Sequence, residues 1–241
     1  MAFASEDDLE QWTVQSLEDM GYDYIHGSEL SPEVPAPVRG SFHEVLLIHR
    51  LRDAVMRLNG HLPPQAVETV VNTVRDRQFA GELIQENQRL HELLLRGVPV
   101  SWVEGGEQRD AVARLVDFKD ESNDWIVTNQ FEVVGKTARR PDVVIFLNGM
   151  PIVVIELKGT ESGTLKGAYN QIETYKADIP ALFPTALISV ISDGFNAAYG
   201  SLSAGLDRFM PWRTIDGETV VTPGERAPVE PRRQSTGPHA R

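Results

Sequence analysis

Three ionisable side chains flank the apolar segment VVIFLNGMPIVVI, which carries no charge of its own. Asp142 precedes this segment, and Glu156 and Lys158 follow it. Charged groups beside buried strands are unfavourable unless they are paired or bind a metal. Two carboxylates offer the oxygen ligands that Mg²⁺ prefers, and a neighbouring lysine can position a water or stabilise charge on phosphorus. These residue types therefore indicate metal-dependent hydrolysis, with a structural ion pair at a strand end as the alternative.

A β-hairpin is the element that must bring these side chains together. Its two Val/Ile-rich runs meet at Asn148-Gly149, a pair that strongly favours a two-residue hairpin turn. Because the runs lack polar alternation, both strands are expected to be covered on both faces. Pairing about this turn places Asp142 opposite residue 155 or 156, and Glu156 and Lys158 point to one face. All three side chains are therefore predicted at one end of the hairpin.

The other predicted elements change type at Gly97, from helices before it to strands after it. Ser5 and Asp8 resemble a capping box for the first helix, and Gly21 is suited to end it. Helices are expected over residues 6–20, 43–58, 64–75, 81–96 and 164–177. Strands are expected over residues 22–26, 98–103, 111–118, 124–134, 141–159 and 186–194.

Composition restricts the class of protein. The 241 residues are 41% hydrophobic and 24% charged, as in ordinary globular proteins, and the absence of cysteine excludes disulfides and thiolate chemistry. No apolar run approaches the roughly 20 residues that cross a bilayer, and the acidic start does not resemble a signal peptide. We therefore expect no membrane contact and a cytoplasmic location. The net charge of −12 disfavours nucleic-acid binding over the whole surface, but the chain after residue 38 is close to neutral.

The order Pro-Asp, thirteen intervening residues, then Glu-x-Lys resembles the PD-(D/E)xK nuclease signature. Further segments resemble, in the same order, the N-terminal nuclease region of the restriction (R) subunit of type I restriction–modification enzymes. These segments are LEQWTVQSLEDMGYDYIHG (9–27), LLIHRLRDAVMRLNGHLP (46–63), ENQRLHELLLRGVPV (86–100), NQIETYKADIPALF (170–183), ISDGFNAAYGSL (191–202) and PWRTIDG (211–217). Together they extend over nearly all of the chain before the Pro-rich tail.

This resemblance implies an α/β fold: a restriction-endonuclease-like mixed sheet flanked by helices, with a helical insertion at about 43–96. The nuclease domain is expected over residues 1–222, and a flexible tail or linker over 223–241. The implied reaction is Mg²⁺-dependent hydrolysis of double-stranded DNA. In the family it follows translocation by ATP-driven motor domains, which are not in this chain. The implied protein partners are the modification and specificity subunits.

The resemblance also implies roles for individual residues. Asp142 and Glu156 match the metal-binding carboxylates, and Lys158 matches the catalytic lysine. Glu10 matches an additional acidic residue at the catalytic and metal site. Its spacing from Val14 places it beside the core-facing stripe of the first helix, but a solvated glutamate is an equally good interpretation of the residues alone.

Gln171 and Tyr175 match a Gln-xxx-Tyr motif that follows Glu-x-Lys in part of this nuclease group. They lie four residues apart and so share one helix face. The resemblance implies that they orient the metal carboxylates or the DNA strand. An ordinary polar pair on an amphipathic helix is the alternative.

Two other functions remain open. One is a non-catalytic docking module of the same fold, which the intact Asp142, Glu156 and Lys158 disfavour. The other is a stand-alone PD-(D/E)xK nuclease that acts on modified DNA or on repair intermediates, which the flanking segments disfavour.

Overall fold

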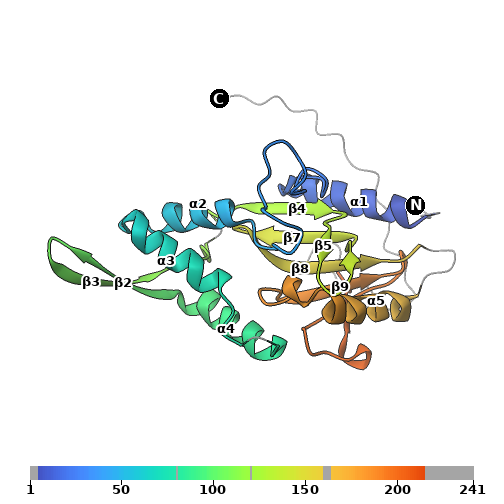
Figure 1. Cartoon of the computed structure of the whole chain (residues 1–241). Helices are drawn as coiled ribbons and strands as arrows, with labels where there is room; N and C mark the ends of the chain where they lie inside the picture. The colour runs from blue at the N-terminus through green and yellow to red at the C-terminus, as the bar shows by residue number, and fades with distance from the viewer. Residues whose placement is uncertain (1–4, 80, 120, 160–163, 215–241) are drawn as a thin grey trace.

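A central mixed sheet organises the protein in a computed structural model that describes residues 5–79, 81–119, 121–159 and 164–214. Its strands are β1 (Asp23–Tyr24), β4 (Trp125–Asn129), β7 (Val143–Leu147), β8 (Met150–Leu157), β9 (Ile188–Ser192), β10 (Ala197–Gly200) and β11 (Met210–Pro211). Within the described residues they form one seven-stranded sheet of order β1-β4-β7-β8-β9-β10-β11 (Figure 1). β1 pairs with β4, and β8 with β9, in parallel, whereas the other neighbours are antiparallel. The predicted α/β class is therefore confirmed.

Helices cover both faces of this sheet (Figure 1). On one face, α1 (Glu6–Asp19) packs Leu9 against strand residues that include Ile155. On the other face, α5 (Leu165–Asp178) packs Ile172 in a cluster with Val154. Because successive strand side chains point to opposite faces, β8 alternates between the α1 core and the α5 core. This two-sided covering is the physical reason for the uninterrupted apolar runs in the sequence.

The β7–β8 hairpin has the predicted turn and register. Asn148 and Gly149 have φ values of 51° and 79°, as a type I′ turn requires. Pairing runs from Leu147↔Met150 at the turn to Val143↔Ile155 at the open end, with an irregularity between Ile145 and Phe146. Extending the Val143↔Ile155 register by one residue places Asp142 opposite Glu156. The pairing expected from the sequence is thus confirmed.

A second group of elements lies at the turn end of this hairpin. It contains α2 (Ile48–Leu58), α3 (Pro64–Arg75), α4 (Leu83–Arg96) and a two-stranded hairpin of β2 (Val98–Glu104) and β3 (Glu107–Ala113). These elements share an apolar cluster with Leu147 and Met150 of the central hairpin. Figure 1 shows β2 and β3 projecting from the rest of the protein. The helical insertion expected from the resemblance is therefore present.

Three predicted elements have a boundary that differs from the structure by about four residues or more, in each case because of a backbone hydrogen bond or turn. The helix expected from residue 43 begins at Ile48, because Leu47 N–H bonds to Gly149 O at 2.9 Å and docks this segment on the hairpin turn. The strand expected over 111–118 lies instead over Glu107–Ala113, as β3. Its register with β2 is set by a turn at Gly105 and Gly106, with φ of 62° and 85°. The strand expected over 124–134 is interrupted at Gln130, where φ is 53°.

Short elements complete the fold. After Gln130, β5 (Val133–Val134) pairs with β6 (Ala138–Arg139) in a separate ribbon. Two 3₁₀ turns, Pro180–Leu182 and Leu206–Arg208, lie on either side of β9 and β10. The domain limits at 222 and 223 lie outside the described residues and stay predictions. No helix in the described part of the chain is long and apolar enough to cross a membrane.

The hairpin turn supplies a test of this packing. Gly149→Ala should lower the free energy of unfolding by at least about 3 kcal/mol, because an added Cβ would meet Leu47 O at 2.5 Å in addition to straining a positive φ. Gly21→Ala is the matched control, since Gly21 has φ of 98° but nothing within 4 Å of an added Cβ. It should cost about 1 kcal/mol. Equal losses for the two variants in urea unfolding would contradict the docking of Leu47 on the turn.

Candidate active site

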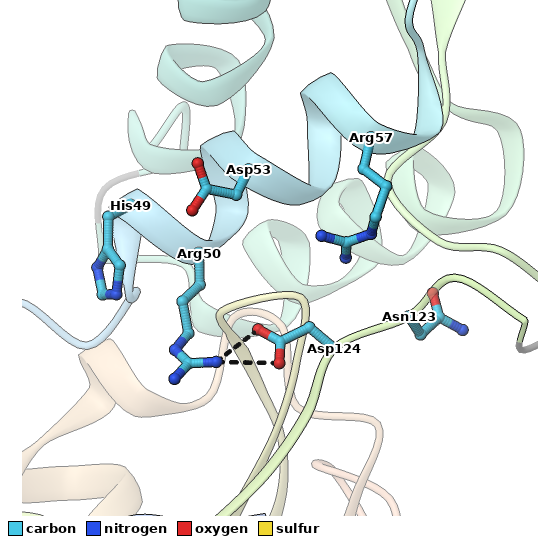
Figure 2. A pocket seen from close by; sticks show the side chains of 6 residues that line it. All are labelled: His49, Arg50, Asp53, Arg57, Asn123 and Asp124. Atoms are coloured by element: carbon cyan, nitrogen blue, oxygen red, sulfur yellow. Dashed lines mark hydrogen bonds and ion pairs between the residues drawn. The ribbon is translucent and has the colours of Figure 1, made fainter.

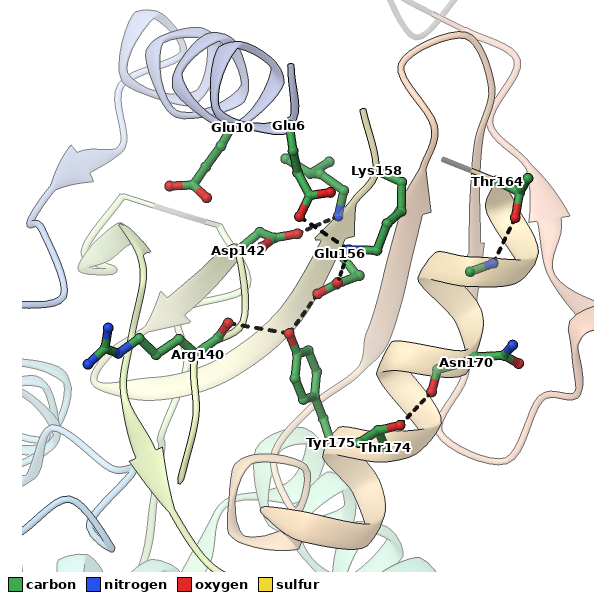
Figure 3. A network of polar contacts seen from close by, with 12 residues as sticks. Glu6, Glu10, Arg140, Asp142, Glu156, Lys158, Thr164, Asn170, Thr174 and Tyr175 are labelled. Carbon is green, nitrogen blue, oxygen red and sulfur yellow. Dashed lines mark hydrogen bonds and ion pairs between the residues drawn. The ribbon is translucent and has the colours of Figure 1, made fainter. Parts of the chain in front are cut away.

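The three predicted side chains meet at the open end of the β7–β8 hairpin. Asp142 lies directly before β7, Glu156 lies in β8, and Lys158 follows it. Asp142 Oδ2 accepts a hydrogen bond of 2.7 Å from the backbone N–H of Leu157, on the partner strand. Lys158 Nζ donates to Glu156 Oε1 at 2.7 Å (Figure 3). The hairpin register therefore brings the two carboxylates and the lysine into one cluster.

Burial determines the electrostatics of this cluster. Asp142 is 7% exposed and Glu156 is 1% exposed. Burial, followed by repulsion from Glu156, raises the pKa of Asp142 to about 8. Burial also raises the pKa of Glu156, although hydrogen bonds from Lys158 and Tyr175 act in the opposite direction. Burial by itself lowers the pKa of Lys158, but the bond to Glu156 and the nearby carboxylates outweigh it, so this pKa is raised.

Helix α5 supplies a second donor to Glu156. The Tyr175 hydroxyl lies 2.9 Å from Glu156 Oε2 and 3.3 Å from the backbone oxygen of Arg140 (Figure 3). Burial and the Glu156 charge raise the pKa of Tyr175, which keeps its hydroxyl protonated as a donor. Gln171, one turn earlier, acts in the opposite direction and lowers the pKa of the same hydroxyl. The alternative, an ordinary polar pair on an amphipathic helix, does not account for Tyr175, which is 3% exposed and bonded to Glu156.

Glu10 is held by two amides rather than by the lysine. Its Oε1 accepts from Asn129 Nδ2 and its Oε2 from Gln130 Nε2, both at 2.7 Å. The side chain is 7% exposed, so the interpretation as a solvated glutamate is wrong. In the described residues, however, no three His, Asp or Glu side chains are grouped closely enough to hold one metal. The structure therefore does not join Glu10 to Asp142 and Glu156 in a single ligand set.

Glu6 is an acidic residue of the cluster that the sequence reasoning missed. Lys158 Nζ lies 3.2 Å from Glu6 Oε1, so the lysine is placed between Glu6 and Glu156 (Figure 3). Glu6 also adds to the upward shift of the pKa of Asp142. The available signal was helical spacing, because Glu6 lies four residues before Glu10 and shares its helix face.

The donor set at the hairpin end fits Mg²⁺. This ion is commonly bound by only one or two protein carboxylates and keeps several waters, so Asp142 and Glu156 suffice as protein ligands. Two buried carboxylates with raised pKa values form a pair whose repulsion a divalent cation would offset. Asp142 and Glu156 are accordingly the residues that could hold the metal.

A concave surface of about 520 Å³ lies elsewhere on the protein (Figure 2). It is lined by His49, Arg50, Asp53, Arg57, Asn123 and Asp124. Arg50 Nη1 is paired with Asp124 at 3.0 Å, so the positive charge of Arg50 is already compensated. Asn148 N–H bonds to Asp124 O at 2.8 Å, which places the surface at the turn end of the hairpin, opposite the carboxylates. It is therefore separate from the candidate active site.

Comparison with known proteins identifies the family. The family description "Type I restriction enzyme R protein N terminus" matches residues 3–208. The chain belongs to this family. Its relatives are named as endonuclease subunits of type I restriction enzymes, which places the family among nucleases of restriction systems. The resemblance stated from the sequence motifs is confirmed.

Three relatives show the extent of the match. The HindI endonuclease subunit of Haemophilus influenzae is 40% identical over 217 residues, which is 88% of this chain and 20% of that protein. An endonuclease subunit assigned to the type I enzyme MjaIXP of Methanocaldococcus jannaschii is 35% identical over 224 residues, 88% of this chain and 21% of that protein. The Escherichia coli EcoprrI endonuclease subunit is 27% identical over 229 residues, 91% of this chain and 67% of that protein. The chain thus spans about a fifth of the length of the first two relatives.

The raised pKa of Asp142 predicts a specific pH dependence. The folded pKa of about 8 exceeds the ordinary value of 3.8, so the contribution of this group to stability is complete below pH 3.8 and is lost as pH rises through 8. Asp142→Asn cannot ionise and retains an oxygen that can accept from Leu157 N–H. In the absence of metal, it should therefore melt above the parent protein, with a difference that grows by about 10 °C between pH 5 and pH 8.5.

Thermal melts at several pH values measure this difference. Asp207→Asn is the control, because the side chain of Asp207 is 81% exposed and its replacement should change the melting temperature little. A parent protein that is more stable than Asp142→Asn at pH 8.5 would show that Asp142 forms a favourable structural ion pair.

Proposed function

We propose that this chain is the Mg²⁺-dependent DNA endonuclease region of a type I restriction–modification enzyme. The observation that carries the proposal is the buried pair Asp142 and Glu156 with Lys158 bonded to Glu156, in a family whose relatives are named as endonuclease subunits. A structural ion pair would require one carboxylate for one lysine. The second buried carboxylate is the feature that favours a metal site.

Each residue has a distinct task in the proposed reaction. Asp142 and Glu156 would hold Mg²⁺, which when bound supplies Lewis-acid polarisation of a phosphate and lowers the pKa of a bound water. Leu157 N–H and Tyr175 hydroxyl each orient one carboxylate. Lys158 carries a positive charge beside Glu156 and would orient the attacking water or stabilise negative charge on the phosphate.

Motor and partner proteins complete the proposal. The relatives HindI and MjaIXP are about five times as long as the matched region. We propose that ATP-driven motor domains, outside these residues, deliver double-stranded DNA to the site, with modification and specificity subunits in the same cytoplasmic complex. The acidic net charge of −12 supports this arrangement, because the nuclease region itself has few cations to spare for phosphate contacts.

Lys158→Ala should lower DNA cleavage at least about 100-fold, because it removes the positive charge at the reacting phosphate. The assay uses supercoiled plasmid DNA, Mg²⁺ and ATP, with the R subunit assembled with its modification and specificity subunits. ATP hydrolysis should be unchanged, since the motor lies elsewhere. Lys119→Ala, at an exposed position, is the matched control and should cleave at the parent rate. Undiminished cleavage by Lys158→Ala would contradict the proposed site, and no cleavage by the parent complex would favour the docking module.

A further inference from the structure

Gln130 has an unusual backbone conformation directly beside the candidate active site. Its φ of 53° lies in the left-handed region, which only one other non-glycine residue of the described chain adopts, namely Asn148 in the hairpin turn. A glutamine in this region is strained, and such strain persists only where surrounding contacts enforce it. Gly27 supplies one such contact, because it packs so tightly that an added Cβ would lie 2.4 Å from Gln130 O.

Gln130 forms hydrogen bonds to two acidic residues. Its backbone N–H donates to the backbone oxygen of Asp142 at 3.2 Å, and its side-chain Nε2 donates to Glu10 Oε2 at 2.7 Å. Asn129 Nδ2 donates to the other Glu10 oxygen at 2.7 Å, and the Tyr24 hydroxyl holds Asn129 Oδ1 at 2.8 Å. Each oxygen of the Glu10 carboxylate therefore has its own amide donor, and the donors are themselves fixed by other contacts.

We propose that Asn129 and Gln130 are positioning residues of the metal site, and this inference rests on the proposed function. They fix the carboxylate of Glu10 while Gln130 also fixes the backbone of Asp142. A carboxylate oxygen has two lone pairs, so each Glu10 oxygen retains one after accepting from an amide. Since Mg²⁺ keeps several of its waters in proteins, Glu10 can accept hydrogen bonds from that hydration shell without binding the ion itself.

Gln130→Gly separates this role from a structural one. Glycine adopts a positive φ without strain and retains the N–H to Asp142, so the metal-free melting temperature should stay the same or rise. Loss of the amide frees the Glu10 carboxylate to move and so should weaken Mg²⁺ binding about tenfold, the lower end of the effect of removing an outer-shell partner. Both quantities are measured on the 241-residue chain, by isothermal titration with Mg²⁺ alone and by thermal melting.

Asn148→Gly is the matched control, because it relieves the same backbone strain at the opposite end of the hairpin. It removes side-chain bonds to Leu115 O and to the backbone N–H of Asp124, so it should lower stability and leave Mg²⁺ affinity unchanged. An unchanged Mg²⁺ affinity in Gln130→Gly would overturn the inference. A fall of several degrees in its melting temperature would equally overturn it, by showing a structural role.

A double-mutant cycle with Glu10→Gln tests whether Gln130 acts through Glu10. If it does, Gln130→Gly should cause little further loss of Mg²⁺ affinity in the Glu10→Gln background. A full, independent loss in that background overturns the inference. If the parent chain binds Mg²⁺ and Gln130→Gly binds it equally, the inference alone fails. If the parent binds no Mg²⁺, the proposed function fails, and the inference fails with it.

Discussion

The register of the β7–β8 hairpin forces two carboxyl groups, those of Asp142 and Glu156, to face each other in the protein interior. Such a pair opposes folding unless its charge is reduced by protonation, by a cation or by hydrogen bonds. The surrounding contacts follow from this constraint. Lys158 contributes one positive charge, and Leu157 N–H and the Tyr175 hydroxyl each donate to one carboxylate. Burial, followed by the remaining repulsion from Glu156, still raises the pKa of Asp142. The geometry thus favours a divalent cation over a purely structural ion pair.

The two-sided sheet explains why distant parts of the chain contribute to one site. Helix α1 covers one face and brings Glu6 and Glu10 to the strand ends, while α5 covers the other face and brings Tyr175. Strand β4, the neighbour of β7, ends with Asn129, and Gln130 follows it directly; both donate to Glu10. Helix α5 packs with Ile126 of β4 in one apolar cluster and α1 packs with Val127 of β4 in another, so apolar packing positions the polar side chains.

Much of the hairpin site could be predicted because its determinants are local. The Asn148-Gly149 pair specifies the turn, the turn specifies the register, and the register determines which residue faces Glu156. The amide contacts to Glu10 could not be predicted in this way, since they join residues 119 and 120 positions apart. The break at Gln130 was equally hidden, because its β-favouring neighbours indicate a continuous strand and only the tertiary contacts reveal the left-handed conformation.

A crystal structure of the chain soaked in Mn²⁺ tests the central claim most directly, because Mn²⁺ has the oxygen preference of Mg²⁺ and gives an anomalous signal. We predict one strong anomalous peak between the carboxylates of Asp142 and Glu156, and no such peak in Asp142→Asn. A peak that is bound by other residues would contradict the account. So would a parent structure without a peak at these carboxylates.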